Sequence, residues 1–301
     1  MGWRVKSVRL RKEATRKMRF VNAKPDVLRP TGADAAAAWA ALVDADFEQV
    51  SRLREPEPPA DHYASIAPRF RPNGLAAPEL PVLESLAKPA DTWLDIGAGG
   101  GRFAVPLAGR VARVVAIEPS TSMRDALRSA AGEAARSNIE IHEVRWPADA
   151  WTVDADVSLA AHSLYDIRDI GPFLDAMERH TRRLCIVLVG QFARGATLRP
   201  LFEAVHGEWL RRLPGLKEFV ALLGARERRY ELRTVGQGGT VTVVAHEDAY
   251  AEARRLLWLA PGSAKERRMR ALMDQWWWTP DGMSMPASRP FIGIVTWEPP
   301  R

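Results

Sequence analysis

The stretch TWLDIGAGGG at residues 92–101 decides the fold of this chain of 301 residues. Residues 92–96 have the short apolar run of a buried strand, and five residues rich in glycine follow it. Glycine permits a tight turn and lets a ligand approach the backbone without meeting a Cβ atom. We expect a helix over residues 102–109, whose first N–H groups are open to a ligand. The stretch therefore predicts a ligand-binding strand, loop and helix.

Strands and helices continue to alternate after this loop. Further buried strands are predicted at residues 112–118, 138–146, 156–162 and 183–190, with helices at 121–137 and 170–180 between them. Such alternation produces right-handed crossovers and a parallel sheet. The sequence therefore predicts an α/β fold with a doubly wound, mostly parallel sheet.

The flanking regions are mainly helical. Helices are predicted at residues 33–53, 61–70 and 79–88 before the first strand, and at 199–212 and 215–224 after the fifth. Short strands are expected at 229–235 and 240–246, then a helix-rich segment at 247–278 and a closing strand at 289–297. We divide the chain into a basic, flexible tail (1–30), an N-terminal helical lid (31–90), a ligand-binding core (91–190) and a C-terminal part of the sheet (191–301). The last part includes a helical insertion on the substrate side at about 247–288.

The positive charge of the chain is confined to its N-terminus. Of 43 basic and 37 acidic residues, seven basic residues and one acidic residue lie in residues 1–17, so 36 of each remain in the body. A basic tail can hold nucleic acid or an anionic membrane. The alternatives are a disordered leader, or an upstream start codon with the working protein beginning near Met18. The neutral body argues against extensive phosphate contacts. The single cysteine, Cys185, indicates a reducing, cytoplasmic setting, and no apolar run is long enough to cross a membrane.

The spacing of the glycines separates two ligand classes. A dinucleotide loop expects a small residue at the sixth position, where this chain has Arg102. Asp95, Gly97, Gly99 and Gly101 instead fit an acidic residue followed by three alternating glycines. Here the sequence resembles the class I methyltransferases that use S-adenosylmethionine (SAM), including bacterial methyltransferase-domain proteins of unassigned substrate. The resemblance implies a seven-stranded Rossmann-like sheet, S-adenosylhomocysteine (SAH) as product, and a loop, Ala98 included, that carries the methionine end of SAM.

A second carboxylate follows the second strand. Glu118 lies about 20 residues after the loop, a spacing that suits hydrogen bonds to a ribose diol, as the resemblance also implies. Pro119 follows it, and Met123 stands where the family has an apolar contact to adenine. After the third strand the family pattern is altered. Asp149, which follows Ala148, can take the place of the family's adenine-binding Asp from a position shifted by one or two residues, or Trp146 can stack on the adenine ring instead. The alternative is that Trp146 is a core residue and Asp149 caps a loop or helix.

Candidates for proton transfer lie in the segment AAHSLYD after the fourth strand. His162 would accept a proton from the methyl acceptor, because active-site residues in open α/β sheets gather at the carboxyl ends of strands. Tyr165 and Asp166 are candidates for orienting the substrate. The alternative for His162 is a hydrogen-bonding role at the cofactor or the neighbouring loop. The histidines share no metal-ligand spacing, so no metal site is predicted.

Residues outside the core are expected to shape the acceptor site. Tyr63 and Phe70 are candidates for a lid over the cofactor, and the three tryptophans at 276–278 for packing the insertion onto the sheet or lining an apolar pocket. We expect a SAM-dependent methyltransferase that acts on a small-molecule O or N acceptor. The alternatives are an RNA methyltransferase tethered by residues 1–17 and a non-catalytic scaffold that keeps the fold.

Overall fold

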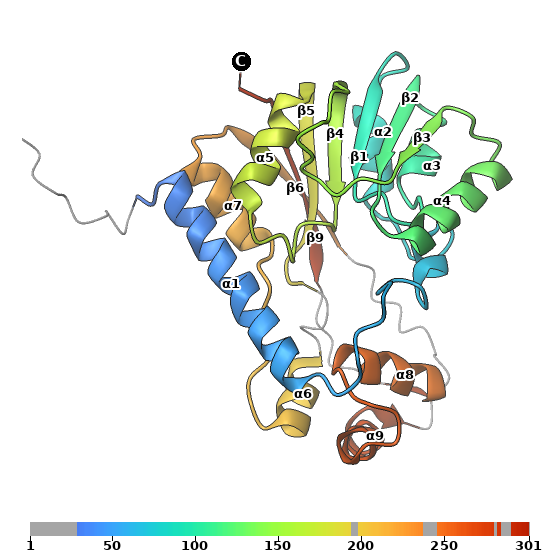
Figure 1. The fold of residues 1–301 in the computed structure, drawn as a ribbon, viewed down its shortest axis with the longest axis vertical. Coiled ribbons are helices and arrows are strands. Elements are labelled where there is room, and N and C mark those ends of the chain that lie inside the picture. The colour runs from blue at the N-terminus through green and yellow to red at the C-terminus, as the bar shows by residue number, and fades with distance from the viewer. Residues whose placement is uncertain (1–28, 194–197, 237–245, 280–281, 284–289, 301) are drawn as a thin grey trace, which may run out of the picture.

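A seven-stranded sheet forms the centre of the molecule (Figure 1). The computed structural model describes residues 29–193, 198–236, 246–279, 282–283 and 290–300. The strands of the sheet are β1 Thr92–Ile96, β2 Arg113–Ile117, β3 Ile139–His142, β4 Ala155–Ala161, β5 Thr181–Gly190, β6 Tyr230–Gly236 and β9 Phe291–Trp297. Their order is β3-β2-β1-β4-β5-β9-β6, and a separate pair joins β7 Trp278–Thr279 to β8 Gly282–Met283.

The sheet is parallel from β3 to β5, and β9 runs antiparallel to both of its neighbours, β5 and β6. This arrangement confirms the predicted mostly parallel, doubly wound, seven-stranded fold. β1 lies between β2 and β4, so the chain crosses to opposite sides of the sheet on either side of it. Ligands of such sheets bind outside the carboxyl ends of the strands at this switch point. The glycine loop leaves β1 at that place.

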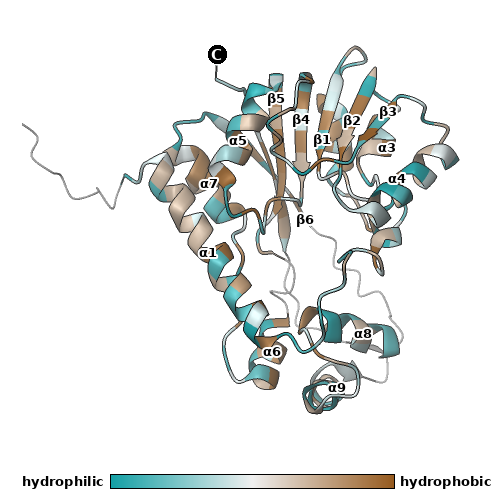
Figure 2. Ribbon diagram, in the orientation of Figure 1, coloured by the Kyte–Doolittle hydropathy of each residue, from teal (hydrophilic) through white to brown (hydrophobic). Residues whose placement is uncertain are grey.

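Helices cover both faces of the sheet. The described helices are α1 Gly32–Leu53, η1 Ala67–Phe70, α2 Leu80–Leu86, α3 Ala104–Leu107, α4 Thr121–Glu133, α5 Ile170–Arg179, α6 Arg199–His206, α7 Leu216–Ala225, α8 His246–Leu256 and α9 Ala264–Trp276. One buried cluster joins α1, α5 and α7 to one face, and a second joins α2, α3 and α4 to the other. The strands between them are apolar, whereas α4, α8 and α9 show long hydrophilic stretches (Figure 2).

Helices α6, α8 and α9 form a separate layer, which we call the cap. Figure 1 shows it at the bottom of the view, with α1 running from the level of the sheet down to it. The cap has its own core, in which Leu201, Phe202, Met269, Met273 and Trp277 are buried. Capping explains where its last helix begins, since the Ser263 hydroxyl accepts a hydrogen bond of 3.1 Å from the Glu266 N–H.

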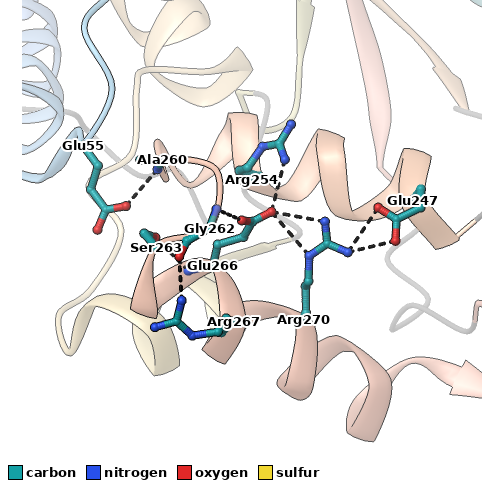
Figure 3. Close-up of polar contacts among 9 residues, drawn as sticks. All are labelled: Glu55, Glu247, Arg254, Ala260, Gly262, Ser263, Glu266, Arg267 and Arg270. Carbon is teal, nitrogen blue, oxygen red and sulfur yellow. Dashed lines mark hydrogen bonds and ion pairs between the residues drawn. The ribbon is translucent and has the colours of Figure 1, made fainter.

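Buried charge joins the two longer cap helices. The carboxylate of Glu266, only 4% exposed, lies between Arg254 of α8 and Arg270 of α9, at 3.1 and 3.2 Å (Figure 3). It also accepts a hydrogen bond from the Gly262 N–H. The linker after α1 is attached to the same region, because Glu55 accepts a hydrogen bond of 2.8 Å from the Ala260 N–H. These contacts fix the cap beside the end of α1.

Several sequence expectations need correction. The third strand ends at His142 rather than residue 146, the helix after Glu118 ends at Glu133 rather than 137, and the helix after the glycine loop is the single turn α3. Trp277 and Trp278 pack within the cap and not onto the sheet, because α9 contacts α6 and α8, while Trp276 is exposed.

Two further expectations fall on residues that the structure does not describe. The basic residues of 1–17 and the strand expected at 240–246 lie outside the described ranges, except that His246 begins α8. In the described part of the chain, no helix combines the length and the apolar character that a membrane span requires.

Candidate functional site

The glycine loop turns sharply away from β1 because its glycines adopt left-handed backbone conformations. Gly97 has φ +77°, and a Cβ atom there would lie 2.6 Å from the Ser163 Cβ. Gly101 has φ +88°, and its Cβ atom would lie 2.5 Å from Leu127 Cδ1. The N–H groups of Gly97 and Ala98 both donate to the Ile117 carbonyl, at 2.8 and 3.0 Å. Only glycine fits both the turn and the close approach of neighbouring side chains.

A cavity of about 540 Å³, here called the glycine-loop cleft, opens beside this turn. Its size accommodates a nucleoside-sized ligand. The predicted site residues in its wall are Asp95, Gly97, Ala98, Gly99, Glu118, Pro119, Met123, Trp146, His162 and Asp166. Four others do not line it: Gly101 packs against Leu127 below the loop, Tyr165 lies behind His162, and Ala148 and Asp149 lie beyond Trp146.

Asp95 places an unpaired carboxylate at the base of the glycine-loop cleft. The residue is 2% exposed, and neither carboxylate oxygen has a hydrogen-bond partner. Burial, together with the negative charge of Glu118, raises the pKa of Asp95 to about 7. A buried carboxylate without a partner is costly for the fold, so its position calls for a polar or cationic group of a ligand.

Glu118 is held in place by two backbone N–H groups. Its Oε2 accepts from Gly99 at 2.9 Å and its Oε1 from Ser120 at 2.8 Å. Burial raises the pKa of Glu118, although these hydrogen bonds oppose the shift. Both oxygens can still accept further hydrogen bonds, because a carboxylate offers about four acceptor positions. The carboxylate is thus oriented toward the cleft before any ligand arrives.

The segment before β1 covers one side of the cleft, a feature that the sequence indicated only through Tyr63 and Phe70. Both rings line the cleft, with centroids 6.2 Å apart. Asp61 accepts hydrogen bonds of 3.0 Å from the Ser120 hydroxyl and from the Ser122 N–H at the start of α4. The hydrogen bond from Ser122 leads the interactions that lower the pKa of Asp61 to about 2. Sequence reasoning missed Asp61, whose one signal was its place directly after the proline-rich residues 55–59.

Trp146 is a core residue that also lies in the wall of the glycine-loop cleft. Its indole is 6% exposed and donates a hydrogen bond of 3.2 Å to the Phe173 carbonyl, as a core residue would. It also lines the glycine-loop cleft. Asp149 is exposed.

His162 is the centre of a chain of hydrogen bonds. Its Nε2 lies 3.1 Å from Oε1 of Glu79, which is fully buried, and its Nδ1 lies 3.0 Å from the Tyr165 hydroxyl. The Tyr165 hydroxyl also accepts from the Gly190 N–H at 2.8 Å. In a neutral imidazole whose Nε2–H donates to the Glu79 carboxylate, Nδ1 accepts from the Tyr165 hydroxyl. Arg102 completes the chain, 3.3 Å from Glu79. Both ring nitrogens are therefore engaged, and the imidazole has a fixed orientation.

A second, larger cavity of about 1240 Å³ lies between the sheet and the cap, and we call it the cap cavity. Its wall comes from α1, residues 54–58, α6, residues 210–213, α7 and the end of α8, and it includes the basic residues Arg54, Arg211, Arg212 and Lys217. The lining is largely aliphatic and aromatic, with Leu42, Val50, Phe202, Leu216 and Trp258 among its members. His62 and Asp166 line both this cavity and the glycine-loop cleft. The two spaces therefore meet at these two side chains.

Two titratable groups at or near this junction, Asp46 and His62, were not singled out from the sequence. Burial, together with the charge of Asp166, raises the pKa of Asp46 on α1 to about 6. Desolvation and the cations Arg255 and Arg54 lower the pKa of His62. Asp46 gave no signal in the sequence, because a single carboxylate on an amphipathic helix is normally solvated.

Comparison with known proteins identifies a domain family for part of the chain and similar folds for most of it. A profile of the methyltransferase domain family matches residues 94–183, and no curated protein matches the chain. Three solved structures are similar in fold, each 13% identical. YcgJ of Bacillus subtilis has a TM-score of 0.54 over 74% of this chain and 99% of its own. A candidate methyltransferase of Bacillus halodurans has a TM-score of 0.54 over 74% and 100%. YjhP of Escherichia coli has a TM-score of 0.51 over 79% and 98%.

The matched segment runs from β1 through α5 into β5, and it includes the glycine loop, Glu118 and His162. The structural likeness, at this level of identity, concerns the fold. Residues 94–183 therefore match the methyltransferase domain family, and they lie in a sheet with the fold of the three solved structures.

Proposed function

We propose that this protein is a methyltransferase that transfers a methyl group from SAM, bound in the glycine-loop cleft, to a small-molecule O or N acceptor. SAM supplies a methyl group already activated by a positively charged sulfur, so the protein mainly has to orient the reactants and exclude water. One observation carries the proposal. The buried, unpartnered carboxylate of Asp95 lies beneath a glycine turn whose neighbour, Glu118, is fixed by backbone N–H groups.

The residues of the cleft fit the parts of SAM. Asp95 suits the ammonium group of the methionine end, since a cation there removes the cost of its buried charge. Glu118 suits the two ribose hydroxyls, which would donate to its remaining acceptor positions. Met123 and Trp146 offer apolar walls of the kind that an adenine ring requires.

Proton transfer is proposed at the junction with the cap cavity. His162 remains our candidate catalytic residue, and its imidazole can take a proton from the acceptor only by giving up one of its two hydrogen bonds. Asp166 borders both spaces and makes no hydrogen bond or ion pair with another described residue, so it is a candidate for orienting the acceptor. Tyr165, behind His162, is a positioning residue in this scheme.

The cap cavity supports a small acceptor. It is mostly apolar and adjoins the cleft, as a pocket for a small molecule does. The residues after position 17 carry equal numbers of basic and acidic side chains, which favours a small-molecule acceptor over RNA. An RNA acceptor would be bound through the basic residues 1–17. We accordingly propose a small molecule as the partner of the site.

Transfer of a labelled methyl group tests this proposal. The full chain is incubated with SAM labelled in the methyl group and with separate small-molecule and RNA fractions of a bacterial extract. We expect label in the small-molecule fraction and release of SAH, both lost in Glu118→Ala. Label in RNA alone, or no SAH release with any fraction, would contradict the proposal.

A further inference from the structure

A fully buried carboxylate, that of Glu79, lies behind the wall of the glycine-loop cleft. Glu79 does not line the cleft, but both of its partners, Arg102 and His162, do. Its Oε1 lies 3.1 Å from Nε2 of His162, and its Oε2 lies 3.3 Å from Nη2 of Arg102. Each carboxylate oxygen is thus bound to a different residue of the cleft wall.

Glu79 does not use its side chain to cap its own helix. It stands at the N-cap of α2, where a short polar side chain normally accepts from the first N–H groups of the helix. The Glu79 carboxylate makes no such hydrogen bond and instead contacts residues that follow β1 and β4. A buried charge is costly unless it is paired, so the two groups that this carboxylate joins account for its position.

Arg102 holds one of the two carboxylate oxygens. It occupies the sixth position of the glycine loop, where a dinucleotide loop has a small residue. Its partly buried side chain donates to the Ala76 carbonyl as well as to Glu79. A guanidinium has donors and no acceptor, so Oε2 of Glu79 is fixed as an acceptor from Arg102, and Oε1 is left to the imidazole.

The imidazole of His162 is held on its other sides as well. Its backbone is left-handed, at φ 57°, and its backbone N–H donates to the Leu188 carbonyl at 2.9 Å. The ring lies nearly parallel to the Tyr165 ring, at an interplanar angle of 18°, and Nδ1 lies 3.0 Å from the Tyr165 hydroxyl. A left-handed residue other than glycine is unfavourable by itself, so these contacts and Glu79 have to hold it in place.

We propose that Glu79 is a positioning residue for methyl transfer, because its carboxylate fixes the neutral ring of His162 in the Nε2–H tautomer. An ionised carboxylate can only accept, so the ring nitrogen that faces it must carry the hydrogen. The lone pair of the ring is then on Nδ1, the nitrogen that receives the proton of the acceptor. The catalytic part of this inference rests on the proposed function, whereas the tautomer does not.

The proton and the electrons balance in this arrangement. As the acceptor atom bonds the methyl carbon, the C–S bond of SAM breaks and its electron pair remains on sulfur, which becomes the neutral thioether of SAH. The proton of the acceptor passes to Nδ1, which gives up its hydrogen bond with the Tyr165 hydroxyl. The ring is then positively charged beside the negative charge of Glu79, and it returns the proton to solvent after the products leave.

Nitrogen NMR of the histidine rings tests the tautomer on the full chain, without SAM or an acceptor. The protein carries 15N in its histidine side chains, and the signals of His162 are those that disappear in His162→Asn. The two neutral tautomers and the doubly protonated ring differ in the 15N shifts of Nδ1 and Nε2. At pH 8 we expect the Nε2–H tautomer in the wild type.

Variants show which residue sets the tautomer. Glu79→Gln keeps the size of the side chain, but Arg102 can bond only the amide oxygen, so the NH2 group faces Nε2 and the tautomer is expected to reverse. Tyr165→Phe removes the partner of Nδ1 and is expected to leave the Nε2–H tautomer in place. Glu84→Gln is the control, since Glu84 also lies on α2 and pairs with an arginine, Arg110 at 3.3 Å, but none of its contacts reaches His162.

Methyl transfer then tests the role of Glu79 in the reaction. With saturating labelled SAM and the small-molecule fraction of a bacterial extract, we expect the rate to fall about tenfold or more in Glu79→Gln, and to stay unchanged in Glu84→Gln. The affinity for SAH, measured by calorimetry, is expected to be the same in both variants, because Glu79 does not line the cleft. Circular dichroism verifies that both variants fold.

The possible results separate the two proposals. An Nδ1–H or doubly protonated ring in the wild type overturns the inference, and so does a tautomer that Tyr165→Phe reverses or that Glu79→Gln leaves unchanged. The first two of these results decide the question even if Glu79→Gln does not fold. A reversed tautomer with an undiminished rate overturns the role of Glu79 in methyl transfer. If SAH does not bind to the folded wild type, the proposed function fails, and the NMR result for the tautomer stands apart from that failure.

Discussion

Glu118, at the end of β2, accepts a hydrogen bond of 2.9 Å from the N–H of Gly99 in the loop after β1. The carboxylate and the glycine turn are therefore fixed relative to one another across two neighbouring strands. A ligand that contacts both groups loses little conformational entropy on binding, because the site is already ordered.

The conformation of Gly101 makes it irreplaceable in the fold. Gly101→Ala would place a Cβ atom 2.5 Å from Leu127 Cδ1 at φ +88°, so we expect a loss of about 2–4 kcal/mol in the free energy of unfolding. Gly132→Ala in α4 is the control, because a Cβ atom there meets nothing within 4 Å. It is expected to be neutral or to stabilise by up to about 1 kcal/mol. Urea denaturation measures both, and equal effects would contradict the account of the loop.

We expect the charged carboxylate of Asp95 to destabilise the ligand-free fold and to strengthen the binding of SAH. Its pKa is about 7 in the folded protein against 3.8 in the unfolded chain, so the folded state retains a proton between these pH values. The stability that this proton contributes is present near pH 4 and is lost as the pH rises through 7. Asp95→Asn should therefore stabilise the ligand-free protein by about 1–3 kcal/mol at pH 8, and by little at pH 4.

Urea denaturation at the two pH values measures this difference, and SAH affinity is measured in parallel. The variant is expected to bind SAH at least tenfold more weakly. A variant that is less stable at pH 8 and binds SAH normally would show that Asp95 has a purely structural role.

The sequence predicted the centre of the fold better than its borders. Asp95, Gly97 and Glu118 lie where expected, because the loop and its acidic partner depend on local geometry at strand ends. The site beyond them depends on long-range contacts. Asp46 and Asp166 line the same cavity because α1 packs against α5, and no local pattern in either segment encodes that approach.

Long-range contacts also explain why the sequence left two roles open for Trp146, a core residue or an adenine-stacking one. Its burial depends on Phe173 of α5, which accepts its N–H, and that contact spans 27 residues of sequence. The cap tryptophans were placed wrongly for a similar reason, since their partners lie on α6 and α8.

His162 offers a test that separates chemistry from positioning. Its φ of 57° is left-handed, a conformation that asparagine tolerates well, so His162→Asn keeps the backbone while removing the imidazole. We expect kcat to fall at least tenfold with SAH affinity unchanged. Tyr165→Phe, which removes the donor to Nδ1, should cause a smaller loss and shift the pH profile of kcat. An unchanged kcat in His162→Asn would limit this histidine to a structural role.

The cap is expected to depend on Glu266. Although burial raises its pKa, the Gly262 N–H, Arg254 and Arg270 lower it overall, so the carboxylate is charged and fully bonded (Figure 3). Glu266→Gln should destabilise the cap by about 2 kcal/mol, because two arginines lose their shared partner. Hydrogen exchange should then rise in α8 and α9 and stay unchanged in β1 and β4. Arg267→Gln is the control, since Arg267 is exposed and donates to the Gly262 carbonyl at the surface. Uniform acceleration throughout the chain would contradict an independent cap core.

The central claim is that the glycine-loop cleft binds SAM through Glu118 and its neighbours. Calorimetric titration of the full chain with SAM and SAH tests it most directly, with NADH as the competing ligand class and Glu118→Ala as the variant. Glu133→Ala on the exposed side of α4 is the matched control. We expect micromolar binding of both sulfur compounds by the wild type and the control, a loss of at least tenfold in Glu118→Ala, and no heat with NADH. Binding of NADH in place of SAM and SAH, or SAH binding that is unchanged in Glu118→Ala, would contradict it.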